Sequence, residues 1–372
     1  MNTMRLERLK AAMHQADLGA VFVSNPKNVM YLTGFKTMLP GGVQSFGDPE
    51  GFVLVHAGRC DFLCDGRYIE GAKQLGGVTA QLLEAPINAE TIAKKVVDLL
   101  PRGTKTLGIE HDALLYCDGA GLAQHVQGVA LKPAEDVFVE LRIRKTPEEI
   151  ALIRKAQDIT CACFDHLVKT IRIGMSERDA ALEVEHFMKH HSEGCSFDPI
   201  VAFGETSCHP HYIPDKNRKL QKNQMVLLDF GAVYGGYAGD LTRMLVMGQA
   251  TARHREVYDI VLEAQLAGLA AIRPGVTGHD IDTVVRNVFQ KHGCLDQFMH
   301  GTGHGVGLAV HEPPRIKIGY TTVLEPGMVF SIEPGLYYAG WGGIRIEDLA
   351  AVTPTGHDNL TVASKKLLEV DA

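Results

Sequence analysis

The stretch MVLLDFGAVYGGYAGDLTRMLVM, residues 225–247, contains two apolar runs separated by a Gly-Gly pair, and it carries two acidic residues. The apolar runs predict buried strands, and the glycines between them are typical of a hairpin turn. A turn centred near Tyr234–Gly235 would place Asp229 and Asp240 opposite each other on one face. Buried like charges repel and lose hydration, which a bound cation would offset. Alternatively, Asp240 lies in a solvated turn and Asp229 caps nearby backbone.

The same arrangement occurs a second time in VFSIEPGLYYAGWGGIRIEDL, residues 329–349. Glu333 and Glu347 lie on either side of a glycine-rich turn that follows an apolar run. The two-residue period of a strand places Ser331 and Glu333 on one face. Two acids are therefore expected to oppose each other again within an apolar sheet. A repeated acidic hairpin favours a metal site over two unrelated turns.

The segment HGTGHGVGLAVHE, residues 300–312, places His300, His304 and His311 among four glycines. Glycine lets the backbone approach a ligand closely, and three histidines here favour a binding role over a single buried histidine. His304 with the four carboxylates makes an oxygen-rich donor set that suits Mn²⁺, Co²⁺, Fe²⁺ or Zn²⁺. Two such ions would deprotonate a shared water near neutral pH, and hydroxide is the natural nucleophile for an amide carbonyl.

A segment upstream of the first hairpin, SFDPIVAFGETSCHPHYIP at residues 196–214, adds two histidines beside prolines and a glycine. Such a rigid turn is a suitable platform for a histidine that contacts substrate, His209 or His211. The alternative is an ordinary polar loop.

Length and composition limit the class of protein. The chain has 372 residues, 45% of them hydrophobic, which fits a globular protein of two domains. The net charge of -7 gives no basic surface for nucleic acid, and no apolar run approaches the roughly 18 residues that span a bilayer. The first residues form an amphipathic pattern unlike a signal peptide. Eight cysteines without a CxxC pair then indicate free thiols and a cytoplasmic location.

Periodicity gives a coarse map of the remaining elements. The first part of the chain alternates strands and helices. Thr146, Pro147 and Glu149 fit the N-cap, first and third positions of a capped helix, and Ser176 marks another helix start. The segment 37–51 is rich in glycine and proline, so we expect a long loop or lid. Further expected strands lie at 20–24, 51–55, 60–64 and 136–141, and further helices at 6–15, 92–100, 254–272 and 279–291.

These motifs together resemble the pita-bread metallopeptidases (family M24), and within them the Xaa-Pro peptidases, prolidase and aminopeptidase P. The resemblance covers nearly the whole chain. It implies a creatinase-type α/β domain over residues 1–137 and a pita-bread α/β catalytic domain with pseudo-two-fold symmetry over residues 138–372. The stretches that carry it are SNPKNVMYLTGF (24–35), DGRYIEGA (65–72), LRIRKTPEEIALIRKA (141–156), LLDFGAVYGGYAGDLTR (227–243), HGTGHGVGLAVHE (300–312), SIEPGLY (331–337) and GGIRIEDL (342–349).

The resemblance also implies a role for each motif residue. Asp229 would bind one of two divalent ions, and Asp240 and Glu347 would bridge them. His304 and Glu333 would complete the ligand set, and Glu333 would also move the proton from water to the leaving nitrogen. The other residues implied at the substrate site are His311 on the oxyanion, His211 on the leaving side, His300, Arg345 beside the bridging glutamate, and Tyr337 or Tyr338.

The function implied by the resemblance is hydrolysis of the amide bond before proline, in dipeptides or short peptides, with manganese as the expected metal. A dipeptidase is favoured because the chain lacks the longer N-terminal domain expected of many aminopeptidases. A homodimer is the family expectation. The alternative is a creatinase- or ectoine hydrolase-like enzyme for a small non-peptide amide or amidine, although creatinases lack the full metal set. A non-enzymatic binding module is the third possibility, but such proteins are expected to lose ligands.

Overall fold

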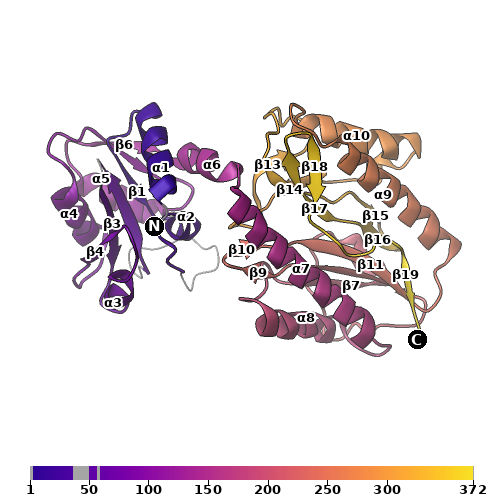
Figure 1. Cartoon of the computed structure of the whole chain (residues 1–372). Helices are drawn as coiled ribbons and strands as arrows, with labels where there is room; N and C mark the ends of the chain where they lie inside the picture. Colours follow the sequence, from indigo (N-terminus) through magenta and orange to yellow (C-terminus); the bar gives the residue numbers. More distant parts are fainter. Residues whose placement is uncertain (1–2, 37–49, 57–58, 372) are drawn as a thin grey trace. The chain divides into compact units, whose positions relative to one another are not determined.

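The structure is a computed structural model that describes residues 3–36, 50–56 and 59–371. The chain divides into two compact units, Met1–Arg142 and Ile143–Ala372 (Figure 1). The division follows Arg142, whereas the sequence suggested a boundary after residue 137. Most of the expected lid at 37–51 lies outside the described residues. None of the described helices is long and apolar enough to cross a membrane.

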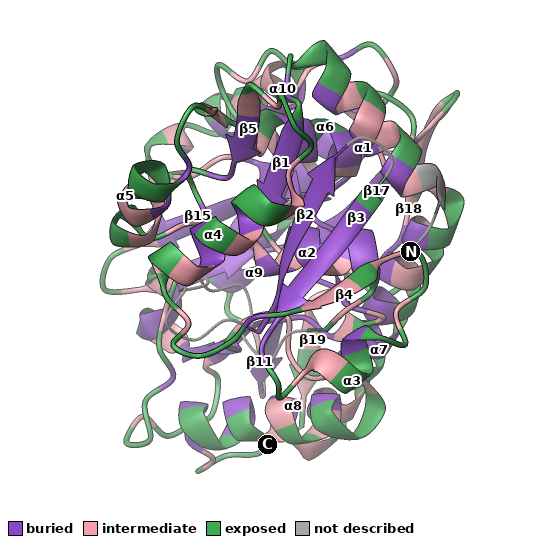
Figure 2. Cartoon of the chain, turned by 90° about the vertical axis from the view of Figure 1, so that its left-hand side faces the viewer, coloured by how far each residue is buried: buried purple, intermediate pink, exposed green. Residues whose placement is uncertain are grey.

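The first unit contains a six-stranded mixed sheet in the order β4-β3-β2-β1-β5-β6. Strand β1 runs antiparallel to β2 and parallel to β5. The central strands are buried (Figure 2), as their continuous apolar runs predict. The strands are β1 (Ala20–Val23), β2 (Phe52–His56), β3 (Arg59–Cys64), β4 (Thr79–Leu82), β5 (Thr106–Ile109) and β6 (Ala130–Pro133). The helices are α1 (Thr3–Gln15), α2 (Pro26–Thr33), α3 (Ile69–Ala72), α4 (Ala89–Leu99), α5 (Tyr116–His125) and α6 (Glu135–Ile143).

One expected strand of this unit is wrong: residues 136–141 lie in helix α6. Val137, Phe138 and Leu141 are buried, which is the spacing of one helix face. Two acidic residues in the first turn complement the helix dipole. The prediction fails because a short apolar run does not by itself distinguish a strand from a buried helix.

The second unit combines two helix pairs with the strands that carry the acidic hairpins (Figure 1). Its α-helices are α7 (Pro147–Thr170), α8 (Glu177–His191), α9 (Ala252–Ala271) and α10 (Gly278–Lys291). One sheet has the order β19-β11-β8-β7, with β7 (Ile200–Phe203), β8 (Met225–Phe230), β11 (Leu241–Met247) and β19 (Leu368–Val370). Another has the order β13-β12-β14-β17-β18, with β12 (Gly303–Gly305), β13 (Glu312–Ile316), β14 (Val329–Ile332), β17 (Asp348–Thr353) and β18 (Gly356–Asn359). Two short ladders pair β9 (Val233–Tyr234) with β10 (Tyr237–Ala238) and β15 (Gly335–Tyr338) with β16 (Gly342–Arg345). Two 3-10 turns, η1 (Gly204–Cys208) and η2 (Leu295–Gln297), complete the unit.

All four α-helices of this unit begin with a capping box. The N-caps predicted at Thr146 and Ser176 are confirmed, and Thr251 and Thr277 have the same role at α9 and α10. The order of helix pair and acidic hairpin therefore occurs twice. This repeat is the pseudo-two-fold pattern that the sequence suggested.

Burial of β8 determines which way its acidic residue points. Val226, Leu228 and Phe230 pack with α7 and α8. Leu227, on the opposite face, packs with α9 and β16. Because side chains alternate along a strand, Asp229 shares the face of Leu227 and points away from α7 and α8.

The register of the first hairpin differs from the prediction. Asp229 pairs with Thr242, not with Asp240, which lies just before the β8–β11 ladder. The turn is centred between Gly235 and Gly236, both with positive φ, one residue later than predicted. A shift of two residues preserves the face of a strand, so both carboxylates still reach the same side.

The register of the second hairpin agrees with the prediction. Ile332 pairs with Asp348 in one ladder, and Gly335 pairs with Arg345 in the next. The two ladders share one register. Glu333 and Glu347 occupy opposite positions in the gap between them.

Gly231→Ala tests the close approach that follows Asp229. An added Cβ would lie 1.8 Å from the carbonyl oxygen of Gly239, next to Asp240. We expect the free energy of unfolding to fall by roughly 1–3 kcal/mol, measured by urea denaturation, because the backbone must shift. Gly356→Ala is the matched control, since nothing lies within 4 Å of a Cβ there. Equal losses of unfolding free energy in both variants would show that the backbone approach between Gly231 and Gly239 is not rigid.

Candidate metal centre

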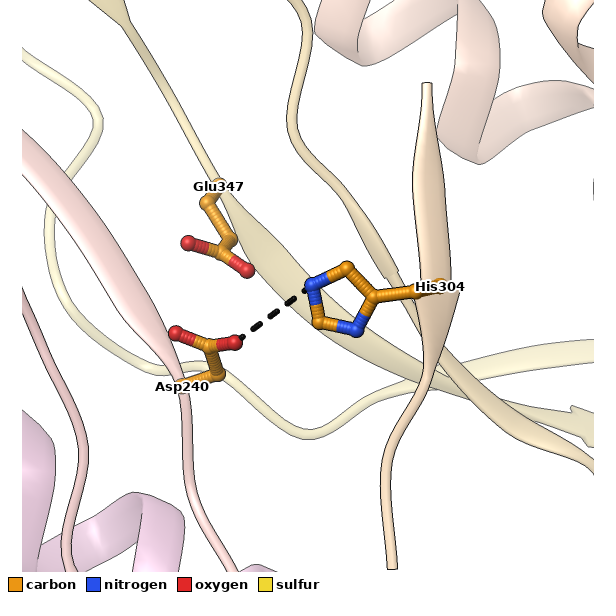
Figure 3. A group of neighbouring side chains, drawn as sticks. All are labelled: Asp240, His304 and Glu347. Carbon is orange, nitrogen blue, oxygen red and sulfur yellow. Dashed lines mark ion pairs between the residues drawn. The ribbon is translucent and has the colours of Figure 1, made fainter. Parts of the chain in front are cut away.

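Three buried side chains from distant parts of the sequence converge between the acidic hairpins (Figure 3). Asp240 precedes β11, His304 lies in β12, and Glu347 precedes β17. One ligand atom of each lies within 4.8 Å of the others. His304 Nε2 is 3.7 Å from Asp240 Oδ2, the pair joined by the dashed line in Figure 3.

The two remaining predicted ligands line the same cavity of about 930 Å³. Glu333 Oε1 lies 3.0 Å from His304 Nε2 and accepts a hydrogen bond from Ser331 Oγ at 3.0 Å. Asp229 Oδ2 lies 2.5 Å from Arg345 Nη2. The structure therefore brings all five ligands predicted from the sequence into one cavity.

Two carboxylate oxygens in this cavity are buried without a protein partner. Asp229 Oδ1 and Glu347 Oε1 have no hydrogen-bond partner in the described part of the chain, a rare condition in folded proteins. Burial, followed by repulsion from neighbouring carboxylates, raises the pKa of Asp240 and Glu347 well above its usual range. A divalent cation would bind the orphaned oxygens and offset the repulsion. The residues present therefore fit a divalent metal.

Glu333 differs from the other carboxylates of the cavity. Burial by itself would raise its pKa, but the nearby His304 outweighs burial, aided by His300 and Arg345. The pKa of Glu333 is lowered to about 2. This carboxylate is therefore ionised at neutral pH.

Arg345 holds the carboxylates in place through a buried network. Its Nη2 donates to Asp229, its Nε to Thr242 Oγ1 at 3.0 Å, and its Nη1 to Tyr337 Oη at 2.8 Å. Thr242 Oγ1 in turn donates to Glu347 Oε2 at 2.8 Å. Of the two tyrosines suggested by the sequence, Tyr337 is the one that joins this network.

Three further predicted histidines line the cavity. His300 Nε2 lies 2.9 Å from Tyr337 Oη, and the ring of His311 packs edge-on against His304 at a centroid distance of 4.1 Å. Burial lowers the pKa of His300, and burial together with His304 lowers that of His311 to about 4. Both imidazoles are therefore neutral at neutral pH. The third, His211, is exposed at the cavity wall.

Sequence reasoning did not assign the remaining residues of the cavity wall, although most of them lie in the segments 196–214 and 300–312 that supply the histidines. The residues alone left open which upstream histidine reaches the site, and the resemblance singled out His211, which lines the cavity. His209 is exposed and stacks on Tyr212 at 6.3 Å, and it does not line the cavity. The additional wall residues are the apolar Phe197, Ile200, Ile213 and Val310 and the charged Asp198, Arg315 and Lys317.

Comparison with known proteins agrees with this geometry. Residues 151–354 match the model of metallopeptidase family M24, and residues 5–144 match the creatinase/prolidase N-terminal domain. The chain belongs to metallopeptidase family M24. Its fold is confirmed as an α/β creatinase-type domain followed by a pita-bread catalytic domain. Membership of this family implies divalent metal ions at the cavity.

Relatives match this M24 chain over nearly its whole length. An Xaa-Pro dipeptidase of Pyrococcus furiosus is 34% identical, over 98% of this chain and 99% of its own. The structure of an Xaa-Pro dipeptidase from Bacillus anthracis has a TM-score of 0.89 at 35% identity, covering 98% of this chain and 99% of that one. An X-Pro aminopeptidase from Thermotoga maritima has a TM-score of 0.85 at 28% identity, covering 97% and 100%. Because an aminopeptidase of similar length matches, a compact chain does not by itself favour a dipeptidase.

Thr242→Val tests the network that supports the metal ligands. The variant keeps the shape of the side chain but removes the hydroxyl between Arg345 and Glu347. We expect the affinity for Mn²⁺, measured by chelator competition, to fall about ten- to a hundredfold. Thr242→Ser keeps the hydroxyl and should bind metal as the wild type does. Unchanged affinity in Thr242→Val would reject this role.

Proposed function

We propose that this M24 member is a two-metal hydrolase that cleaves the amide bond before proline. The observation that carries the proposal is the complete set of five donors around one cavity, with two buried carboxylate oxygens left for a metal. The relatives include Xaa-Pro dipeptidases and an X-Pro aminopeptidase, which supports the preference for proline. A non-enzymatic module would have no need of four carboxylates gathered in one cavity.

The five donors would hold two divalent ions, and we propose manganese as the physiological metal. The donors are Asp229, Asp240, His304, Glu333 and Glu347. When bound, the ions lower the pKa of water so that it attacks an amide near neutral pH. Glu333, ionised and fixed through Oε1 by His304 and Ser331, takes the proton from water and passes it to the leaving nitrogen.

The neutral histidines supply hydrogen bonds to the substrate. A neutral imidazole can donate from one ring nitrogen without placing a second cation beside the metals. His311, packed against His304, is positioned to stabilise the oxyanion of the scissile carbonyl. His211 would contact the leaving side, and His300 is held by Tyr337.

The cavity wall supports a dipeptidase over an aminopeptidase. Arg315 and Lys317 line the cavity together with Asp198 and apolar side chains. In an X-Pro dipeptide the carboxylate follows the proline directly, and a basic side chain would attract it. A longer peptide has an uncharged amide at the same place. We therefore propose X-Pro dipeptides as the preferred substrates.

A substrate panel tests this function. We expect the Mn²⁺-loaded enzyme to hydrolyse X-Pro dipeptides, with a lower kcat/KM for X-Pro-X tripeptides and no turnover of X-Ala controls, measured by release of free amino acid. Preference for the tripeptides would make the enzyme an aminopeptidase. If the metal-replete enzyme hydrolyses no X-Pro substrate, the proposal is wrong. A small non-peptide amide would then be the favoured substrate.

Substitutions separate metal binding from catalysis. Asp240→Ala and His304→Ala should lose metal and activity together, because each removes a shared ligand. His311→Ala should keep its metal while kcat falls about a hundredfold, as expected for a group that acts in the transition state. Metal content by plasma emission and steady-state kinetics measure both. An active, metal-replete Asp240→Ala variant contradicts the assignment.

A further inference from the structure

A buried ion pair closes the turn that carries His311. The neighbouring residue, Glu312, accepts a hydrogen bond from the amide of Ala309 through Oε2 at 3.1 Å. Its Oε1 lies 3.1 Å from Lys145 Nζ. The side chains of Lys145 and Glu312 are only 2% and 7% exposed. Both oxygens of this carboxylate are thus engaged, one within the turn and one by a residue far away in the sequence.

The turn itself is tightly packed around that carboxylate. An added Cβ at Gly307 would lie 2.3 Å from Glu312 Oε1. Gly307 N donates to Ala309 O at 3.0 Å, and Gly307 O accepts from Ala238 N at 2.8 Å. Ala238 is two residues before Asp240. One end of the turn is therefore tied to the first acidic hairpin, and the other end is held by Lys145.

Lys145 is in turn fixed by its own backbone. Its amide donates to Gly327 O at 2.8 Å. It immediately precedes Thr146, whose capping box begins α7. In the same helix start Glu149 accepts a hydrogen bond from Tyr237 Oη at 2.6 Å. The beginning of α7 thus contacts both the histidine turn and the first hairpin. These contacts leave the ammonium group of Lys145 little freedom to move.

The energetics of such a pair favour a role in conformation over a role in stability. Burying two charges costs nearly as much hydration as their attraction returns, so apolar residues of the same size would stabilise the fold equally well. A buried pair with fixed geometry does define one arrangement of the backbone. Here His311 directly precedes Glu312 in that backbone, and its ring lies against His304.

We propose that Lys145 and Glu312 are positioning residues for His311, an inference that rests on the peptidase function proposed above. The ion pair fixes the turn so that the imidazole points at the carbonyl oxygen of the scissile bond. The segment at the start of α7, which contributes no ligand and no substrate contact, thereby acts on the reaction. Lys145 has this effect only through Glu312.

The experiment compares Lys145→Met, Glu312→Gln and the double variant, all in the full chain loaded with Mn²⁺. We expect kcat for an X-Pro dipeptide to fall about ten- to a hundredfold in each, with KM and metal content unchanged. The losses should not add in the double variant, because all three lose the same contact. The double variant should recover melting temperature relative to Lys145→Met, since it leaves no buried charge unpaired. If a single variant fails to fold, the double variant tests the proposal in its place.

Arg144→Gln is the matched control. Arg144 precedes Lys145 and forms an ion pair with Glu325 at 3.2 Å, but the two side chains are 33% and 50% exposed. The substitution removes the same charge one residue away without touching the histidine turn. We expect wild-type kcat. A loss equal to that of Lys145→Met would overturn the proposal.

A second measurement does not depend on turnover. In protein loaded with diamagnetic Zn²⁺ in place of Mn²⁺ and labelled with ¹³C at histidine Cε1, the His311 resonance is identified by its loss in His311→Asn. It should shift in Lys145→Met and Glu312→Gln and stay in place in Arg144→Gln. If the wild type cleaves no X-Pro substrate, the proposed function fails, and this resonance still decides the positioning role. A folded Lys145→Met variant with an unmoved resonance, or with wild-type kcat, overturns the inference.

Discussion

The rest of the catalytic unit depends on one constraint: four carboxylates, three of them buried and Glu333 half-buried, meet in a single cavity. Their mutual repulsion and lost hydration oppose folding. Arg345 and His304 offset part of this cost from within the protein. Two carboxylate oxygens remain without a partner among the described residues, and divalent metal ions would offset the rest of this cost. The stable interior on both sides of β8 holds these groups in place against their repulsion.

The two halves of the unit stabilise each other's ligands. Arg345, from the second acidic hairpin, donates to Asp229 in the first. Thr242, from the first hairpin, donates to Glu347 in the second. Each half therefore supplies two of the four acids. Each half also supplies one hydrogen-bond donor to an acid of the other half. Such reciprocal contacts explain why the site needs both copies of the repeated pattern. The histidine segment, by contrast, belongs to the second half alone.

The sequence predicted much of this site, because its evidence is local. Acidic pairs, glycine-rich turns and capping boxes all act within a few residues, and the five ligands followed from them. The register at Asp240 was predicted two residues away from its observed value, because the exact centre of a Gly-Gly turn decides it. Helix α6 was mistaken for a strand because its apolar run was short. The contact of Thr242 with Arg345 could not be predicted, since it joins residues that only the fold brings together.

The dispersal of the ligands has a consequence for how the chain folds. Asp229 and Glu347 are separated by more than half of the catalytic unit, and both must be in place before the metal ligands are complete. Contacts so distant in sequence form late, after the entropy of closing the intervening chain has been lost. A metal that binds only the completed cavity then stabilises the native state selectively. Metal occupancy in this protein would thus report that the two halves have docked.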